Sequence, residues 1–462
     1  MTWTPRIIPS ARRKYLGIAD AIAADIRSGV LRAGDRLPPQ REIAHSLSVD
    51  LTTVTRALNE ARKRNLVEAT VGKGTFVRLD QPVDRHEAQE LPSPVFDLSM
   101  NAPPQPAEAE LGKRIFSAIA NTLSEPNALM RLSYQENIGT RRDRLAGAEW
   151  LRPRLGTIPV ERMVVTGGAQ SALYALAKSL FKRGDVLCAG TLCYPGFKAA
   201  AADCGLNLLP LPMDGHGIIP DALEEACKRS TVRGVYLVPT IDNPTTATLP
   251  DQRRKQIVEI AQRYSLEIVE DDAYADLADT PLPPLASYAP DRTWHIATLS
   301  KSVTPALRIA YVACPNTVHA LQLSAVLRIT NPMAPPLMSA LATGWIADGS
   351  LDAIRSALRK ENRERQQIAA SILGHSTFAA HPCGHHIWLS LPQQWHASSF
   401  TEIANRSGLA VVASDAFDIS GKPENAVRVS LGPASSQSIL KEQLNLLSTL
   451  LTRPPFASGT VV

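Results

Sequence analysis

The chain contains 462 residues, of which 44% are hydrophobic and 20% charged, and its formal net charge at pH 7 is +5. This length predicts two or three domains, and the composition excludes disordered and fibrous proteins. No apolar run reaches the roughly 18–20 residues of a membrane helix, and the N-terminus lacks the apolar core of a secretory signal. We therefore expect a cytoplasmic protein without a membrane partner.

Positive charge is concentrated near the N-terminus. Residues 1–80 contain 14 Lys and Arg against 8 Asp and Glu, a net charge of +6, whereas the rest of the chain contains 35 against 36, a net charge of −1. A polyanionic partner would therefore meet the first 80 residues. The six cysteines are scattered without ligand spacing, and His385-His386 has no Cys or carboxylate at that spacing. We expect reduced thiols, a structural histidine pair and no metal site.

The texture of the sequence divides the chain into three segments. Residues 12–78 form a compact block of helical periodicity that ends in a Gly-rich hairpin. Residues 79–96 are polar and contain proline without an apolar period, which is typical of a linker. Residues 97–455 alternate short apolar runs with helical stretches, the pattern of an α/β domain with a mainly parallel sheet. Within them we expect a large lobe at about 130–340 and a small α+β lobe at about 341–455.

The N-terminal block is expected to contain a helix-turn-helix. Ile18, Ile22 and Ile26 recur every four residues, so the first helix has one buried face. Asp50 suits the N-cap of the third helix, because its carboxylate can accept hydrogen bonds from the free amides of the first turn. The expected elements are a first helix that ends at Gly29, helices over residues 41–47 and 51–64, and two short strands within residues 66–77.

The exposed face of the third helix is the face that a helix-turn-helix inserts into the major groove of DNA. Basic residues at the end of that helix and at the tip of the hairpin could hold phosphates. A helical protein-interaction domain with a solvated basic face would also fit these features. The expected DNA contacts are Arg41, Leu51, Thr52, Thr53, Arg56, Arg62, Lys63 and Lys73.

The run from Tyr15 to Val77 resembles the GntR-type winged helix nearly end to end. The resemblance implies that double-stranded DNA is a partner. One position departs from the family, because the pair after the turn is Asp50-Leu51 where Ser-Arg is common. Leu51 can offer only an apolar contact, for example to a thymine methyl group. We therefore expect an operator unlike that of the Ser-Arg members.

The large domain carries its strongest chemical signal at Thr298-Leu299-Ser300-Lys301, directly after a predicted strand. A lysine at a strand end in a pocket can lose its proton and form a Schiff base with an aldehyde. The hydroxyls of Thr298 and Ser300, together with Arg308, suit a phosphate. A lone Ser-Lys is usually a solvated surface pair, so the interpretation depends on partners elsewhere. The expected strands are 162–166, 186–189, 206–209, 234–238, 266–270, 294–299 and 309–313, and the expected helices are 169–181, 251–264 and about 350–373.

Those partners follow other predicted strands. Asp271 closes one strand, and an acid held there can pair with a protonated pyridine nitrogen. Tyr274 and Asn243 could donate hydrogen bonds to the phenolate oxygen of the same ring, and Tyr194 could stack on its face. The turn 166–170 lies between a strand and a helix, where free amides and the helix dipole favour an anion. Each feature also has an ordinary structural interpretation, as a surface carboxylate, a core aromatic or a turn.

Together, residues from about 100 to 455 resemble the fold-type I, class I aminotransferases. The resemblance implies that pyridoxal 5'-phosphate (PLP) is the cofactor, that Lys301 forms the internal aldimine and that Asp271 holds the ring nitrogen. It also implies that Arg428 clamps a ligand carboxylate, and that Tyr134 reaches the phosphate of a neighbouring subunit in a homodimer. The implied phosphate cup is Gly168, Ala169, Gln170, Thr298 and Arg308, and the implied phenolate donors are Asn243 and Tyr274.

Three motifs depart from the aminotransferase pattern. The usual Asn-Pro-Thr-Gly ends in Thr246, the usual Pro-Gly-Leu-Arg has Ala306 at its second position, and the first serine of Ser-x-Ser-Lys is Thr298. Every side chain that would contact the cofactor remains usable.

A GntR-type winged helix followed by an aminotransferase-like domain is the architecture of the MocR/GabR subfamily, which the chain resembles over almost its whole length. The resemblance implies a PLP-dependent transcription regulator, associated with the nucleoid when bound to DNA, that senses a small amine or amino acid. The effector could be a γ-amino acid, a sulfonate, an α-amino acid or PLP. Two alternatives remain: a working aminotransferase (transaminase) that carries a DNA-binding domain, and a regulator that responds to the PLP level alone.

Overall fold

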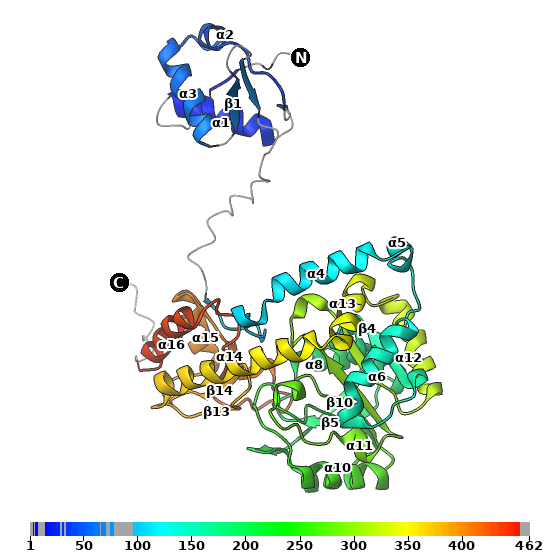
Figure 1. The fold of residues 1–462 in the computed structure, drawn as a ribbon. Coiled ribbons are helices and arrows are strands. Elements are labelled where there is room, and N and C mark those ends of the chain that lie inside the picture. The colour runs from blue at the N-terminus through cyan, green and yellow to red at the C-terminus, as the bar shows by residue number, and fades with distance from the viewer. Residues whose placement is uncertain are drawn as a thin grey trace. The chain divides into compact units, whose positions relative to one another are not determined.

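The computed structural model describes residues 3, 5–7, 14–27, 30–31, 34–64, 66–70, 74–77 and 96–452. The chain divides into two compact units, Met1–Ser93 and Pro94–Val462, and each is described by itself (Figure 1). Gly29, Lys73 and residues 79–95 of the expected linker lie outside the described residues. In the part of the chain that is described, no helix combines the length and the apolar character needed to cross a bilayer.

The N-terminal unit has the elements expected of a winged helix. Its third helix buries Val54 and Leu58 at the spacing that one helix face requires. The Asp50 carboxylate accepts a hydrogen bond from the Thr53 amide at 3.2 Å and caps this helix. Hydrogen bonds from Thr52 and Thr53 lower the pKa of Asp50 to about 2. The elements are α1 (Lys14–Arg27), α2 (Gln40–Ser46), α3 (Leu51–Lys63) and the antiparallel pair β1 (Val67–Thr70) and β2 (Gly74–Val77).

The second unit is built on a seven-stranded sheet in the order β4-β12-β11-β10-β9-β5-β6. The strands are parallel except β12, which runs antiparallel to both of its neighbours. Most are short apolar runs because both faces of the sheet are covered. The strands are β4 (Met163–Thr166), β5 (Val186–Gly190), β6 (Asn207–Leu211), β9 (Val232–Leu237), β10 (Glu267–Asp271), β11 (Thr293–Thr298) and β12 (Ala310–Ala313).

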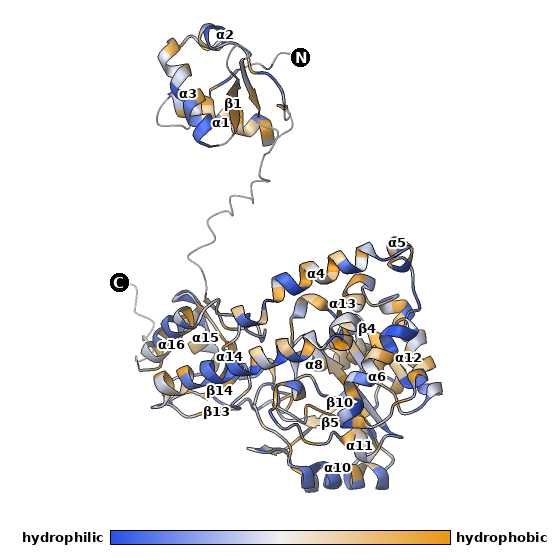
Figure 2. Ribbon diagram, in the orientation of Figure 1, coloured by the Kyte–Doolittle hydropathy of each residue, from blue (hydrophilic) through white to orange (hydrophobic). Residues whose placement is uncertain are grey.

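Helices cover both faces of this sheet. Side chains of α7, α8 and α12 pack in one buried cluster with Val164 of β4. Those of α6 and α13 pack with Met163 and Val165 on the opposite face, and α10 packs there against β9 and β10. Figure 2 shows that the mainly hydrophilic residues of α10 lie at the edge of the unit. The helices are α6 (Arg141–Leu155), α7 (Ala169–Leu180), α8 (Pro195–Cys204), α10 (Asp251–Arg263), α12 (Thr317–Thr330) and α13 (Pro336–Ala347).

A smaller lobe follows the long helix α14 (Ser350–Leu373). Its antiparallel sheet has the order β13-β14-β17-β16, and α15 and α16 pack on it. Its other elements include β13 (Phe378–Ala380), β14 (His386–Ser390), α15 (Ala397–Arg406), β15 (Leu409–Ala410), β16 (Val412–Ala413), β17 (Ala426–Ser430) and α16 (Gln437–Thr452).

Phe96, the last residue of the expected linker, and the residues after it are part of the small lobe. β3 (Phe96–Asp97) pairs in parallel with β15. The Leu98 amide donates to the Ala410 carbonyl at 2.9 Å, and the Leu98 carbonyl accepts from the Ser430 amide at 2.9 Å. We call residues 96–101, which precede the large sheet and pair with the small lobe, the leading segment.

Candidate functional site

The chemically active side chains meet at the carboxyl edge of the large sheet. Asp271 is the last residue of β10, and Lys301 lies three residues beyond β11. Asn243 follows β9, and Gly168 lies between β4 and α7. Parallel strands present their carboxyl ends at one edge, so the topology brings together residues that are far apart in the chain.

Asp271 is a buried carboxylate with one oxygen unpaired. Its Oδ2 accepts a hydrogen bond from the Tyr236 hydroxyl at 3.0 Å, whereas Oδ1 has no partner among the described residues. Burial raises the pKa of Asp271 to about 6, although the Tyr236 hydrogen bond opposes the shift. A buried acid with a free oxygen fits a cationic ring nitrogen, which would stabilise the charged carboxylate. Tyr236 lies within a predicted strand. Apart from its hydroxyl group, nothing in the sequence indicated that it bonds to Asp271.

Lys301 is half-buried, and its ammonium is held by the backbone. Its Nζ donates to the carbonyl oxygen of Asn101 at 2.5 Å and lies 5.8 Å from the centre of the Tyr274 ring. Burial lowers the pKa of Lys301 to about 8, and the positive charges of Arg428 and Arg308 lower it further while Asp271 opposes them. A lysine with this pKa is partly deprotonated near neutral pH, as a nucleophilic amine requires.

Tyr274 is buried beside a group of polar side chains that the sequence did not indicate. Its hydroxyl oxygen accepts from Asn101 Nδ2 at 2.9 Å, and burial raises its pKa. The rings of His385 and His386 lie 5.7 and 5.8 Å from the Tyr274 ring. This histidine pair, expected to be structural, is fully buried and lies beside the site. The pair lies at the start of β14, more than 80 residues from Lys301 in sequence.

The expected phosphate site lies at the start of α7. Gly168 has φ +98, and a Cβ built on it would lie 3.4 Å from the Arg308 guanidinium, so this cation lies against the helix N-terminus. The Gln170 Oε1 oxygen is buried without a partner among the described residues. The Thr298 hydroxyl lies 3.1 Å from that of Ser300 and donates to the Ile309 carbonyl at 3.0 Å. Free amides, the helix dipole and a guanidinium together suit a phosphate.

Arg428 extends from β17 of the small lobe into the same site. Its Nη1 donates to Asn243 Oδ1 at 2.9 Å, and its Nη2 donates to the Ser99 carbonyl. Burial lowers its pKa, and its Nε has no partner in the described structure. The structure therefore brings Arg428 and Asn243 together in one site. Tyr194 is half-buried beside them, and burial raises its pKa with a further contribution from Asp271.

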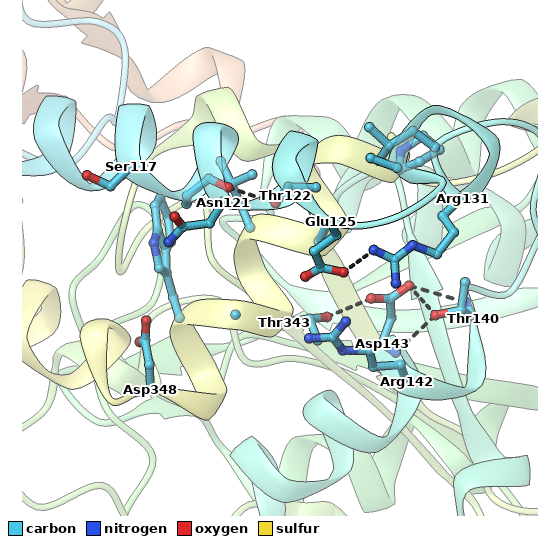
Figure 3. Close-up of a pocket in the computed structure, with 18 of the residues that line it drawn as sticks. Ser117, Asn121, Thr122, Glu125, Arg131, Thr140, Arg142, Asp143, Thr343 and Asp348 are labelled. Atoms are coloured by element: carbon cyan, nitrogen blue, oxygen red, sulfur yellow. Dashed lines mark hydrogen bonds and ion pairs between the residues drawn. The ribbon is translucent and has the colours of Figure 1, made fainter.

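Tyr134 lies apart from this group. Its side chain is 89% exposed and lines a cavity of about 820 Å³ whose lining includes neither Lys301 nor Arg428. The cavity lies beside α4 (Leu111–Ser124), α5 (Ala128–Arg131), α6 and α13. Figure 3 shows the Glu125–Arg131 ion pair there and, beside it, Asp143 bonded to Thr140 and Thr343. Within one chain, Tyr134 therefore has no part in the Lys301 site.

In the N-terminal unit, the expected DNA-contacting side chains lie on or beside α2 and α3. Thr52 and Thr53 also bond their hydroxyls to the Asp50 carboxylate, so part of their hydrogen-bonding capacity serves the cap. Lys73 lies outside the described residues. Exposed members are Arg41, Leu51, Thr52, Arg56, Arg62 and Lys63, and Thr53 is half-buried.

The second unit thus offers a half-buried amine, a buried acid with a free oxygen and an anion site at one sheet edge. These groups fit the aldehyde, the ring nitrogen and the phosphate of PLP. The unpaired oxygen of Asp271 is the most specific part of this fit, because a buried polar atom without a partner is unfavourable until a ligand supplies one.

Comparison with known proteins gives two family matches. The family Aminotransferase class I and II matches residues 93–445, and the family Bacterial regulatory proteins, gntR family, matches residues 14–77. The chain is 31% identical over 452 residues to the HTH-type transcriptional regulator YdeF of Bacillus subtilis, covering 98% of this chain and 97% of that protein. It is 27% identical over 424 residues to the vitamin B6 salvage pathway transcriptional repressor PtsJ of Salmonella typhimurium, covering 91% and 95%.

A solved structure shares the fold of the second unit. The α-aminoadipate aminotransferase LysN of Thermus thermophilus, in complex with N-(5'-phosphopyridoxyl)-L-leucine, superimposes with a TM-score of 0.72. The identity is 24%, and the match covers 78% of this chain and 92% of that one. The fold-type I expectation is therefore confirmed.

The burial of Asp271 predicts a pH-dependent gain in stability for Asp271→Asn. Because the pKa in the folded protein is raised from 3.8 to about 6, the unfolded chain loses this proton first as the pH rises. The cofactor-free wild type therefore loses about 3 kcal/mol of stability between about pH 4 and pH 6, and asparagine avoids this loss. We expect Asp271→Asn to exceed the wild type by about that amount at pH 8 and to differ little at about pH 3.5.

Denaturant unfolding at the two pH values measures the difference. Asp291→Asn, which changes an exposed aspartate, is the control and should give no pH-dependent gap. A gap of equal size for Asp271→Asn at both pH values would contradict the assigned shift.

Proposed function

The chain belongs to the aminotransferase class I and II family and carries a gntR-family domain, the arrangement of MocR-type regulators, and on this premise we propose that it senses a small anionic amine with PLP and adjusts its binding to promoter DNA in the cytoplasm. The observation that carries the proposal is the position of Lys301 and Arg428 in one site. Both are cations in one site, and both donate to backbone carbonyls of the leading segment.

The cofactor would be held by side chains that converge on the sheet edge. When bound, PLP supplies an aldehyde that reacts reversibly with primary amines and a pyridine ring that takes up electron density. Lys301 provides the amine, and its pKa of about 8 keeps part of it unprotonated near neutral pH. Asp271 provides the partner of the ring nitrogen, and Arg308 with the start of α7 provides the phosphate site.

The ligand would be recognised at two points. Its amine competes with the Lys301 amino group for the cofactor, and its anionic group meets the Arg428 guanidinium. Asn243 fixes one arm of that guanidinium at 2.9 Å, which orients the fork for bidentate binding of a carboxylate or sulfonate. The ligand classes that fit are α-amino acids, γ-amino acids and aminosulfonates. In the alternative without an amine ligand, PLP itself would be the effector.

The leading segment offers a route from the site towards the N-terminal unit. The carbonyls of Ser99 and Asn101 accept from Arg428 and Lys301. A ligand that engages both cations removes both hydrogen bonds from a segment that directly follows the expected linker. The free energy available for the response is the difference in ligand affinity between the two arrangements, typically about 1–3 kcal/mol.

A homodimer would complete the site. Tyr134 is 89% exposed, and Phe116, Leu129 and Met130 are also large apolar side chains that are mostly exposed. Exposed apolar side chains gathered on neighbouring helices are typical of an interface. Tyr134 would then reach the phosphate site of the second copy.

Transaminase activity is the second candidate, and the presence of every cofactor-contacting side chain favours it. An enzyme would release a keto acid at steady state with turnover of roughly 1–10³ per second. A sensor would bind the amine without sustained release of product.

The role of Lys301 is tested by Lys301→Ala. We expect this variant to lose the visible absorbance of the bound cofactor and the response of DNA binding to amines, because no other described lysine lies in the site. Basal DNA binding should be unchanged, because the N-terminal unit is untouched. Absorbance spectra and fluorescence anisotropy with labelled promoter DNA give the two measurements.

The exposed Lys441→Ala variant is the control and should behave as the wild type. A normal amine response in Lys301→Ala would disprove sensing through this lysine.

The carboxylate clamp is tested by Arg428→Lys. Lysine keeps the positive charge but cannot form two parallel hydrogen bonds, so we expect affinity for anionic amines to fall by about tenfold or more. Affinity for alkylamines of equal length should not change. Spectral titration of the PLP-loaded variant and of the surface control Arg406→Lys measures this, and an equal loss for both ligand types would contradict the clamp.

The DNA-binding face is tested by Lys63→Ala, which removes one exposed cation at the end of α3. We expect weaker binding to promoter DNA. The slope of log affinity against log salt concentration should be smaller in magnitude by about one. Anisotropy titrations over a range of salt concentrations measure the slope. An unchanged slope would exclude a phosphate contact at Lys63.

A further inference from the structure

Asn101 is buried and forms hydrogen bonds with Lys301, Tyr274 and His386. Its carbonyl oxygen accepts from Lys301 Nζ at 2.5 Å. Its Nδ2 lies 2.9 Å from the Tyr274 hydroxyl oxygen and 3.2 Å from His386 Nδ1. The two hydrogens of this amide group are therefore both used, one towards each partner.

The contacts of His386 fix the direction of these hydrogen bonds. His386 Nε2 lies 3.1 Å from the carbonyl oxygen of Asp242, which can only accept, so Nε2 carries the proton. Burial and the Arg428 charge lower the pKa of His386 to about 3, so the ring is neutral and its Nδ1 is an acceptor. The group that faces Nδ1 must then be the NH2 of Asn101 and not its oxygen.

This orientation determines what the Tyr274 hydroxyl can do. Its oxygen accepts from Asn101, so the hydroxyl hydrogen must point elsewhere. No described residue accepts that hydrogen, and the buried Oδ1 of Asn101 has no partner either. The hydroxyl is therefore left free to donate to a ligand in the site.

We propose that Asn101, oriented by His386, is a positioning residue whose side chain presents the Tyr274 hydroxyl hydrogen to the phenolic oxygen of bound PLP, while its backbone carbonyl accepts a hydrogen bond from Lys301. This inference rests on the proposed function, because it takes PLP as the occupant. It adds to that function a chain of hydrogen bonds from the Asp242 carbonyl through His386 and Asn101 to Tyr274. This series of hydrogen bonds joins the large lobe, the small lobe and the leading segment.

The test is the pH at which the visible absorbance of the PLP-loaded protein changes. A hydrogen bond to an ionised oxygen favours the ionised form. Asn101→Ala frees the Tyr274 hydroxyl to turn away, so we expect the midpoint of the titration to rise by on the order of one pH unit. A purely structural role would change the stability of the protein without moving this midpoint.

Variants of His386 separate positioning from packing. His386→Leu removes the acceptor and should raise the midpoint, whereas His386→Asn offers an oxygen at the position of Nδ1 and should restore most of the wild-type value. Because His386 acts through Asn101, the double variant Asn101→Ala/His386→Leu should shift no further than Asn101→Ala alone. Asn362→Ala is the matched control, because Asn362 is also a buried asparagine with an unpaired Oδ1 but bonds only the Cys383 carbonyl.

The possible outcomes separate the positioning role of Asn101 from the proposed function. An unchanged midpoint in Asn101→Ala, or additive shifts in the double variant, would overturn the positioning role while the proposed function stands. A wild-type protein without a visible band that depends on Lys301 would overturn the proposed function and this inference with it.

Discussion

Desolvation of three ionisable groups at one sheet edge is the constraint on which the site depends. Burial raises the pKa of Asp271, lowers that of Lys301 and lowers that of Arg428. Each charged form is therefore destabilised by its surroundings until a partner of opposite character arrives. The leading segment partly offsets this by offering carbonyl oxygens to both cations. A ligand that replaces these carbonyls gains affinity from groups already held in place.

Residues with a chemical motif at a strand end could be predicted from the sequence. Lys301 and Asp271 each follow an apolar run, and parallel strands bring such ends together. The sequence could not predict the roles of Asn101, Tyr236 and His386. Asn101 contacts site residues, His386 among them, that are 173 or more positions away along the chain, and Tyr236 matters because it is buried. The antiparallel direction of β12 was also unpredictable, since a short apolar run carries no information on strand direction.

The resemblance to known families supplied what local chemistry could not. No spacing rule links Arg428 to Asn243, yet the two side chains meet at 2.9 Å. Tyr134 shows the opposite case, since the family pattern assigns it to a cofactor site and the single chain leaves it 89% exposed. In the proposed homodimer, Tyr134 would instead reach the site of the second copy. The leading segment has a similar dual character, because its strand belongs to the small lobe while its carbonyls serve the site.

Chemical trapping of the cofactor tests the central claim most directly. The PLP-loaded protein is reduced with borohydride, which fixes the cofactor permanently to the amine that holds it, and is then digested and analysed by mass spectrometry. The account predicts a pyridoxyl-phosphate mass on the peptide that contains Lys301 and on no other lysine peptide. Labelling of a different lysine, or spread over several surface lysines with Lys301 unmodified, would contradict it.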